Sequence, residues 1–187
     1  MYPIVTEKIN EYLESHRKDL DGIYISGGEP LMHEGVVSFL QYAKTLNYKI
    51  KIHTNGMFYE RLKTILAQKL VDHVSLDIKN APSAYAKTCG VEDMDLKDIE
   101  KSLDLLKQSV VPYDICVTLV DELHNQATIE ELGQWIQGVD TVILQPFEDS
   151  ETTIDHSLHR PSFEVVLKYK KIFEKYVKHV KIRGDQA

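Results

Sequence analysis

Three short segments of the chain combine glycine, polar and charged residues in a way that suits binding of a polar small molecule. They are SGGEP at 26–30, HTNG at 53–56 and SLDIK at 75–79. Paired glycines leave backbone amide and carbonyl groups open to a ligand, and Glu29 adds a charge beside them. By itself, a Gly-Gly turn between a strand and a helix is equally typical of a tight structural connection.

The segment SLDIK places two opposite charges close together. Alternation along a strand puts Ser75, Asp77 and Lys79 on one face, and Leu76 and Ile78 on the other. Since Asp and Lys are rarely buried unless they are paired, the pair is either part of a site or a structural salt bridge.

Regular alternation of short apolar runs and amphipathic stretches surrounds these segments. Strands are predicted at 22–26, 48–53, 73–78, 113–120, 141–145 and 179–183, and helices at 4–18, 34–46, 58–69, 95–109, 127–137 and 161–177. This order predicts an α/β fold with parallel strands, either a doubly wound sheet or a closed or partial β/α barrel. In both architectures the active site lies beyond the carboxyl ends of the strands, where the three segments fall. Segment 146–161 is predicted to be a loop over these ends.

Composition restricts the class of protein. A chain of 187 residues suits one domain, and its net charge of -7 without a basic cluster argues against nucleic acid as a partner. No apolar run approaches the ~20 residues of a membrane span and no signal peptide is apparent, so a cytoplasmic protein is expected. The two cysteines, Cys89 and Cys116, form neither a disulfide framework nor a CxxC pair.

The order of the motifs resembles that of a known family. ISGGEP, HTNG and SLDIK, followed by Tyr85, the 113–120 run, VILQPF and a terminal KIRG, resemble the radical S-adenosylmethionine (SAM) activating proteins of anaerobic ribonucleotide reductase. The related activase of pyruvate formate-lyase shares the set. The resemblance covers nearly the whole chain and implies a partial, TIM-like β/α barrel of parallel strands.

The resemblance also implies a cofactor site for SAM. The GGE turn would bind the amino group of the methionine moiety, Lys79 its carboxylate, and Gln145 the adenosine side. The matching positions are Gly27, Gly28, Glu29, Pro30, Thr54, Asn55, Asp77, Lys79 and Gln145.

The activity implied by the resemblance is reductive cleavage of SAM to methionine and a 5'-deoxyadenosyl radical. That radical removes a hydrogen atom from a glycine of the protein substrate, a glycyl-radical enzyme. A flavodoxin- or ferredoxin-type protein would supply the electron.

The sequence departs from the family in its cysteines. The family's CxxxCxxC loop, which binds a 4Fe-4S cluster, does not occur among these 187 residues, and segment 4–18 matches the helix that follows the loop. We therefore expect a single domain over 1–187, truncated before its first strand, that binds no metal, holds no catalytic residue and is inactive alone. A natural relative without a cluster is the alternative.

Two further departures concern single positions. His53 stands where the family commonly has an acid, and Cys116 where it commonly has an arginine. We expect His53 to be a hydrogen-bonding residue at a strand end and Cys116 to be a packed thiol.

Three other functions remain open on the sequence. A radical SAM enzyme acting on a small molecule, such as the deazapurine-forming enzymes, also carries a GGEP turn. A binding module without catalysis would keep the barrel alone. A Schiff-base lyase with Lys79 as nucleophile is disfavoured, because the chain shows no glycine-rich phosphate loop before a late helix.

Overall fold

The fold is a single parallel sheet with helices in its crossover connections. The computed structural model describes residues 6–151, 153 and 155–184. Six strands pair in the order β1-β2-β3-β4-β5-β6, and every pair of neighbours is parallel. The strands are β1 (Gly22–Ile25), β2 (Lys49–Thr54), β3 (His73–Asp77), β4 (Tyr113–Leu119), β5 (Thr141–Pro146) and β6 (His179–Ile182).

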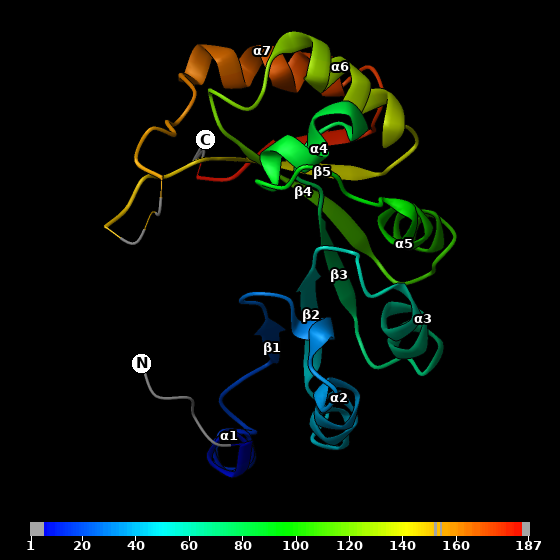
Figure 1. Ribbon diagram of the computed structural model, residues 1–187. Coiled ribbons are helices and arrows are strands. Elements are labelled where there is room, and N and C mark those ends of the chain that lie inside the picture. Colours follow the sequence, from blue (N-terminus) through cyan, green and yellow to red (C-terminus); the bar gives the residue numbers. More distant parts are fainter. Residues whose placement is uncertain (1–5, 152, 154, 185–187) are drawn as a thin grey trace.

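The described residues form seven α-helices and one short 3-10 helix. They are α1 (Thr6–Ser15), η1 (Pro30–Met32), α2 (Val36–Thr45), α3 (Tyr59–Ala67), α4 (Pro82–Thr88), α5 (Lys97–Lys107), α6 (Gln126–Trp135) and α7 (Phe163–Phe173). Helix α1 precedes β1, and the others lie in the connections between strands. Figure 1 shows the sheet curving as an arc, with the helices on its outer side and the inner side uncovered. Strands β1 and β6 form the two ends of the arc and do not pair. The predicted incomplete β/α barrel is therefore confirmed.

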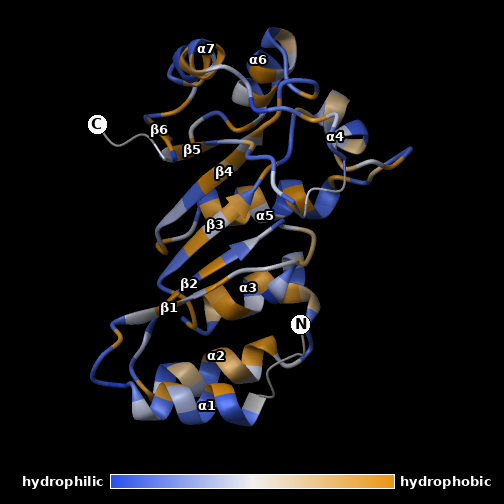
Figure 2. Ribbon diagram, turned by 90° about the vertical axis from the view of Figure 1, so that its left-hand side faces the viewer, coloured by the Kyte–Doolittle hydropathy of each residue, from blue (hydrophilic) through white to orange (hydrophobic). Residues whose placement is uncertain are grey.

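The two faces of the sheet differ in chemistry, and alternation along each strand produces the difference. Ile50, Ile52, Val74, Leu76 and Ile115 point toward the helices and are at most 1% exposed. Figure 2 shows hydrophobic residues on the helix faces that meet the sheet. Each large aliphatic side chain buried in this way contributes roughly 2 kcal/mol to folding, and the core holds the strand ends in register.

Two elements of the structure were not predicted from the sequence. Helix α4 has only seven residues and η1 three, too few to show a helical period of apolar residues. Pro82 at the first turn of α4 was the available signal. The predicted strands and helices are present with ends shifted by a few residues, although residues 4 and 5 of the predicted helix 4–18 lie outside the described residues. Of the predicted loop 146–161, Pro146 belongs to β5, and the described part of the remainder contains no helix or strand.

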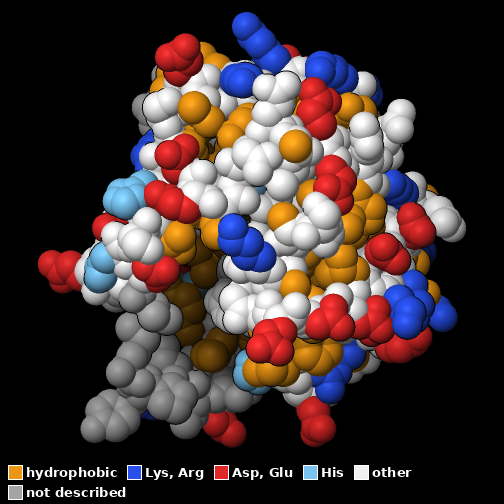
Figure 3. All heavy atoms as spheres, turned by 45° about the horizontal axis from the view of Figure 1, so that its top comes forward, with side chains coloured by type: hydrophobic (Ala, Val, Ile, Leu, Met, Phe, Trp, Pro, Cys, Tyr) orange, Lys and Arg blue, Asp and Glu red, His pale blue; other side chains and the backbone are white. Residues whose placement is uncertain are grey.

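The helices of the described residues are short, and the charges on the face drawn in Figure 3 are of both signs. None of these helices is both long and apolar enough to cross a membrane. Acidic and basic side chains are interspersed on the face drawn in Figure 3, and no continuous basic area appears among the residues described there.

Candidate functional site

A cavity of about 460 Å³ lies at the carboxyl ends of the strands. Its volume falls in the ordinary range for small-molecule sites. It is lined by Tyr24, Ser26, Gly27, Gly28, His53, Asn55, Asp77, Lys79, Cys116, Thr118, Gln145 and Arg183. Six of the predicted site residues are in this lining, whereas Glu29, Pro30 and Thr54 are not.

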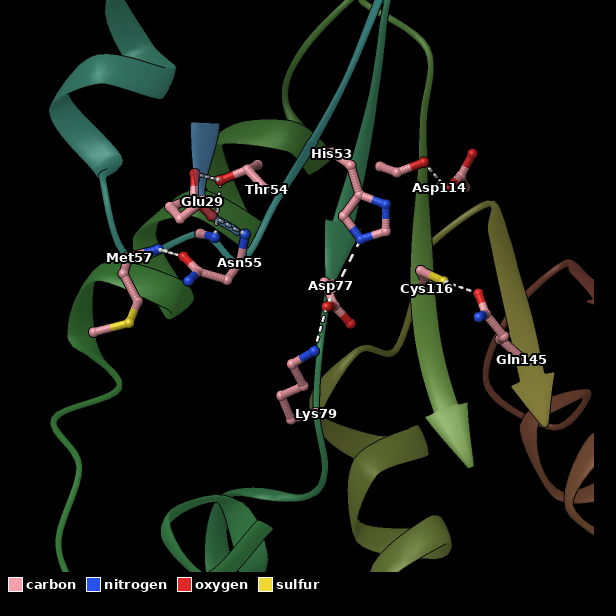
Figure 4. A network of polar contacts seen from close by, with 12 residues as sticks. Glu29, His53, Thr54, Asn55, Met57, Asp77, Lys79, Asp114, Cys116 and Gln145 are labelled. Atoms are coloured by element: carbon pink, nitrogen blue, oxygen red, sulfur yellow. Dashed lines mark hydrogen bonds and ion pairs between the residues drawn. The ribbon is translucent and has the colours of Figure 1, made fainter. Parts of the chain in front are cut away.

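Glu29 connects the first two turns instead of facing the cavity. Its Oε1 accepts hydrogen bonds from Leu31 N at 2.9 Å and from Thr54 Oγ1 at 2.8 Å. Its Oε2 accepts one from Asn55 N at 2.7 Å, as Figure 4 shows, and the residue is only 9% exposed. The carboxylate therefore fixes the GGEP turn against the TNG turn, which presents Asn55 to the cavity.

The glycines of these turns have different structural roles. A Cβ added to Gly27 or Gly28 would meet nothing within 4 Å, so both positions border open space. A Cβ on Gly56 would lie 2.8 Å from Leu76 Cδ1, and Gly56 has φ of +80°. Gly27 and Gly28 thus leave the backbone accessible to a ligand, whereas Gly56 is required by packing.

Asp77 is the centre of a charged group on β2 and β3. Its Oδ2 lies 2.5 Å from Lys79 Nζ and 3.7 Å from His53 Nε2, and His53 Nδ1 lies 2.8 Å from Tyr24 Oη. Burial by itself raises the pKa of Asp77, but His53 and Lys79 together hold that pKa below its usual value. The carboxylate is therefore ionised at neutral pH.

The same group retains binding capacity. Asp77 Oδ1 is buried and has no hydrogen-bond partner among the described residues. The Lys79 side chain is 40% exposed, so its ammonium keeps donors free. The salt bridge that the sequence left as an alternative is present, and both residues also line the cavity.

The opposite wall of the cavity comes from β4, β5 and the end of β6. Cys116 Sγ lies 3.9 Å from Gln145 Oε1, and Arg183 Nη1 donates to the same oxygen at 2.6 Å. Burial raises the pKa of the Cys116 thiol to about 11, so it is protonated at neutral pH. Cys116 is thus the packed thiol that was expected.

Several residues of the cavity were not predicted as site residues. Arg183 follows the last strand, and that position beyond a strand end was the available signal. Tyr24 looks like an ordinary strand residue, and only the fold brings it to His53, which was expected to form hydrogen bonds. Ser26 and Thr118 also line the cavity, but they look like ordinary residues of alternating strands, and no separate signal in the sequence marked them as site residues.

A second polar layer lies below the cavity on the inner face of the sheet. Asp114 Oδ2 contacts Lys51 Nζ at 3.1 Å and His73 Nε2 at 2.6 Å, and Oδ1 accepts from Ser75 Oγ at 2.5 Å. Although burial opposes ionisation, these contacts lower the pKa of Asp114 to about 2. Asp114 therefore ties β2, β3 and β4 together beneath the site.

The residues of the site suit an organic ligand rather than a metal centre. Cys89 is exposed and Cys116 is buried, and the two do not form a pair. Over the described parts of the chain, no group of three or more His, Cys, Asp or Glu residues is placed to hold a metal ion. The open glycines, Lys79 and Gln145 fit a polar ligand.

Comparison with known proteins adds a family relationship. Residues 1–136 match the model of the Radical SAM superfamily. A protein of Methanocaldococcus jannaschii, named as a glycyl-radical enzyme activating enzyme, is 30% identical over 169 residues, which span 87% of this chain and 70% of that protein.

Solved structures agree in fold. A domain of the pyruvate-formate lyase-activating enzyme from Bacteroides vulgatus has a TM-score of 0.68 at 19% identity, covering 87% of this chain and 99% of that domain. SuiB of Streptococcus suis bound to SAM has a TM-score of 0.75 at 13% identity, covering 98% and 44%. At such low identity these structures show the fold alone.

Proposed function

Because the chain belongs to the radical SAM superfamily, we propose that it is the SAM-binding barrel of an activase that generates a glycyl radical in anaerobic ribonucleotide reductase. It is related to glycyl-radical enzyme activating enzymes. The observation that carries the proposal is the convergence of Gly27, Gly28, Asn55, Asp77 and Lys79 on one cavity at the strand ends.

The cavity offers complementary groups for each part of SAM. The open backbone of Gly27 and Gly28 would accept hydrogen bonds from the amino group. The Lys79 ammonium would meet the carboxylate, and Gln145 would lie on the adenosine side, held by Arg183. Glu29, Pro30 and Thr54 would act through the turns that they fix.

Members of this family use SAM together with a 4Fe-4S cluster, which supplies the electron for its cleavage. The described residues of this chain do not fit such a cluster, because only two cysteines are present and they lie apart. We infer that the three cluster cysteines of the active protein come from a CxxxCxxC segment ahead of residue 1.

A groove beside β1 supports that inference. β1 has no strand partner on its outer side among the described residues. A groove of about 800 Å³ runs along this edge between α1 and α2, with Ile9, Ile25 and Phe39 in its wall. Asn10, also in the wall, has a buried Oδ1 without a hydrogen-bond partner in the described structure. One additional parallel strand would cover the apolar wall and pair with β1.

SAM binding is the direct test of the site. The 187-residue chain should bind SAM weakly, with a dissociation constant on the order of 1 mM, or about -4 kcal/mol. A protein extended by its upstream residues and loaded with the cluster should bind SAM more tightly. In that protein Lys79→Ala should weaken binding at least about tenfold in calorimetry, corresponding to ~1.4 kcal/mol.

A matched control separates the site from a general effect of charge. Lys87 is exposed on α4 and does not line the cavity, so Lys87→Ala should bind SAM like the parent protein. Equal weakening by the two substitutions would show that Lys79 has no specific role. An upstream sequence without a CxxxCxxC segment would instead favour a binding module without catalysis.

The partner requires a separate experiment. The extended protein, SAM and a reductant should produce a glycyl-radical signal in electron paramagnetic resonance when mixed with anaerobic ribonucleotide reductase. Pyruvate formate-lyase is tested in a parallel reaction as the alternative protein substrate. A signal with pyruvate formate-lyase alone would refute the proposed partner while leaving the activase class intact.

A further inference from the structure

We propose that His124 is a positioning residue for Lys79, holding the Lys79 backbone so that the ammonium stays at the cavity. The proposal rests on the proposed function in that Lys79 is treated as a SAM-binding residue. His124 lies in the turn between β4 and α6, is 4% exposed and does not line the cavity. It would therefore act through Lys79 and not on the ligand.

The backbone of Lys79 lies just beyond the sheet. The ladder between β3 and β4 ends where Ile78 N donates to Cys116 O at 3.0 Å. Side chains then serve the Lys79 peptide groups: Lys79 N donates to Tyr85 Oη at 3.3 Å, and Lys79 O lies 3.1 Å from His124 Nε2. Two side chains from two other elements thus continue the hydrogen bonding that the neighbouring strand no longer provides.

The chemistry of the imidazole fixes its role. A carbonyl oxygen can only accept, so the hydrogen of the ring must be on Nε2, which donates to Lys79 O. Nδ1 lies 3.1 Å from both Val120 N and Val120 O, and in this tautomer its lone pair accepts from Val120 N. Burial lowers the pKa of His124, which favours this neutral tautomer. One neutral ring therefore links the turn after β4 to the end of β3.

Neighbouring contacts make this link rigid. Tyr169 Oη of α7 donates to His124 O at 3.0 Å, and the Tyr85 ring meets Trp135 edge-on with centroids 6.0 Å apart. Asn80, which is fully buried, donates to Leu123 O at 2.8 Å and thus ties the next residue to the same turn. The Lys79 backbone is thus held by α4 and by the turn after β4, although the Lys79 side chain is 40% exposed.

Two substitutions at one position distinguish the contacts of the ring. In His124→Asn the amide lies near the place of Nδ1, so the contact with Val120 can remain while the contact with Lys79 O is lost. In His124→Gln the amide reaches about the place of Nε2 and can restore the contact with Lys79 O. The protein extended by its upstream residues and loaded with the cluster is the one to use, because it binds SAM measurably.

Amide hydrogen exchange tests positioning without any ligand. His124→Asn should speed exchange at Lys79 and Asn80 about two- to tenfold, the effect of one typical hydrogen bond, and His124→Gln should largely reverse it. Tyr48→Phe is the matched control, since it removes a buried hydrogen bond to Leu13 O on the far side of the fold. Unchanged exchange at Lys79 in His124→Asn would overturn the proposal.

A double-mutant cycle with SAM affinity tests the coupling. His124→Asn should weaken SAM binding about two- to tenfold when Lys79 is present and have no further effect in Lys79→Ala. Equal weakening in both backgrounds would mean a general structural effect and would overturn the proposal. If His124→Asn speeds exchange at Lys79 but Lys79→Ala leaves SAM affinity unchanged, positioning by His124 is supported and the proposed SAM site is refuted.

Discussion

The two walls of the cavity are built differently. On the side of β1 to β3, Glu29 accepts one hydrogen bond within its own turn and two from the TNG turn, and Asp77 contacts both Lys79 and His53. On the side of β4 to β6, Gln145 makes a contact with an exposed arginine and a long one with a thiol. The first wall is held by contacts among buried or half-buried side chains, whereas the hydrogen bond of the second involves an exposed arginine.

This contrast has a physical basis in burial. Burying a charged carboxylate is costly unless it is hydrogen-bonded, so the three hydrogen bonds that Glu29 accepts restrict the residues around it to one arrangement. Exposed polar residues such as Arg183 can exchange their partners for water at little cost. The two walls should therefore respond differently to substitution.

The largest loss of stability is expected for Glu29→Ala, on the first wall. The change removes a buried acceptor from Leu31 N, Thr54 Oγ1 and Asn55 N and should lower the free energy of unfolding by about 3 kcal/mol. Urea denaturation of the 187-residue chain measures it. A loss below about 1 kcal/mol would show that the first wall is not rigidly held.

A pH dependence of stability is expected from Asp114. Its folded-state pKa of about 2 lies below the ordinary value of 3.8, so its ionised form stabilises the fold above pH 4. This stabilisation, about 2 kcal/mol, should be lost as the pH falls from about 4 to 2. Asp114→Asn should remove that part of the pH dependence in urea unfolding followed from pH 2 to 6; an unchanged profile would contradict it.

Substitutions at two glycines should separate a role in core packing from a role in leaving the backbone accessible to the ligand. Gly56→Ala should destabilise the chain by about 2 kcal/mol, since its Cβ would meet Leu76 and its φ is +80°. Gly28→Ala meets nothing within 4 Å and should change stability by less than about 0.5 kcal/mol, while weakening SAM binding in the extended protein. Thermal unfolding and calorimetry measure both; equal destabilisation would remove the distinction.

The smallest effect is expected on the second wall. Gln145→Ala removes one hydrogen bond from an exposed arginine and a weak contact with Cys116, so the free energy of unfolding should fall by less than about 0.5 kcal/mol. Urea denaturation beside Glu29→Ala gives the comparison. A loss as large as that of Glu29→Ala would show that the two walls are equally rigid.

Much of the fold could be predicted from local patterns. Alternating apolar residues in runs such as 113–120 indicated buried strands, and the amphipathic stretches between them indicated crossover helices. Helix α4 was missed because seven residues contain too few turns to show a period. Periodicity did not distinguish an open sheet from a partial barrel; the resemblance of the three motifs did.

For the candidate site, the sequence determined which strand ends carry polar residues, because strand alternation is a local property of the chain. The resemblance of the motifs indicated the site residues Gly27, Gly28, Glu29, Pro30, Thr54, Asn55, Asp77, Lys79 and Gln145, of which Glu29, Pro30 and Thr54 do not line the cavity. Only the tertiary structure decided that Glu29 bonds the TNG turn, that Tyr24 meets His53, and that Arg183 and His124 support Gln145 and Lys79. These contacts join residues 26 to 45 positions apart in the sequence. Such pairs are brought together by the strand order and the curvature of the sheet, which depend on the packing of all the helices together.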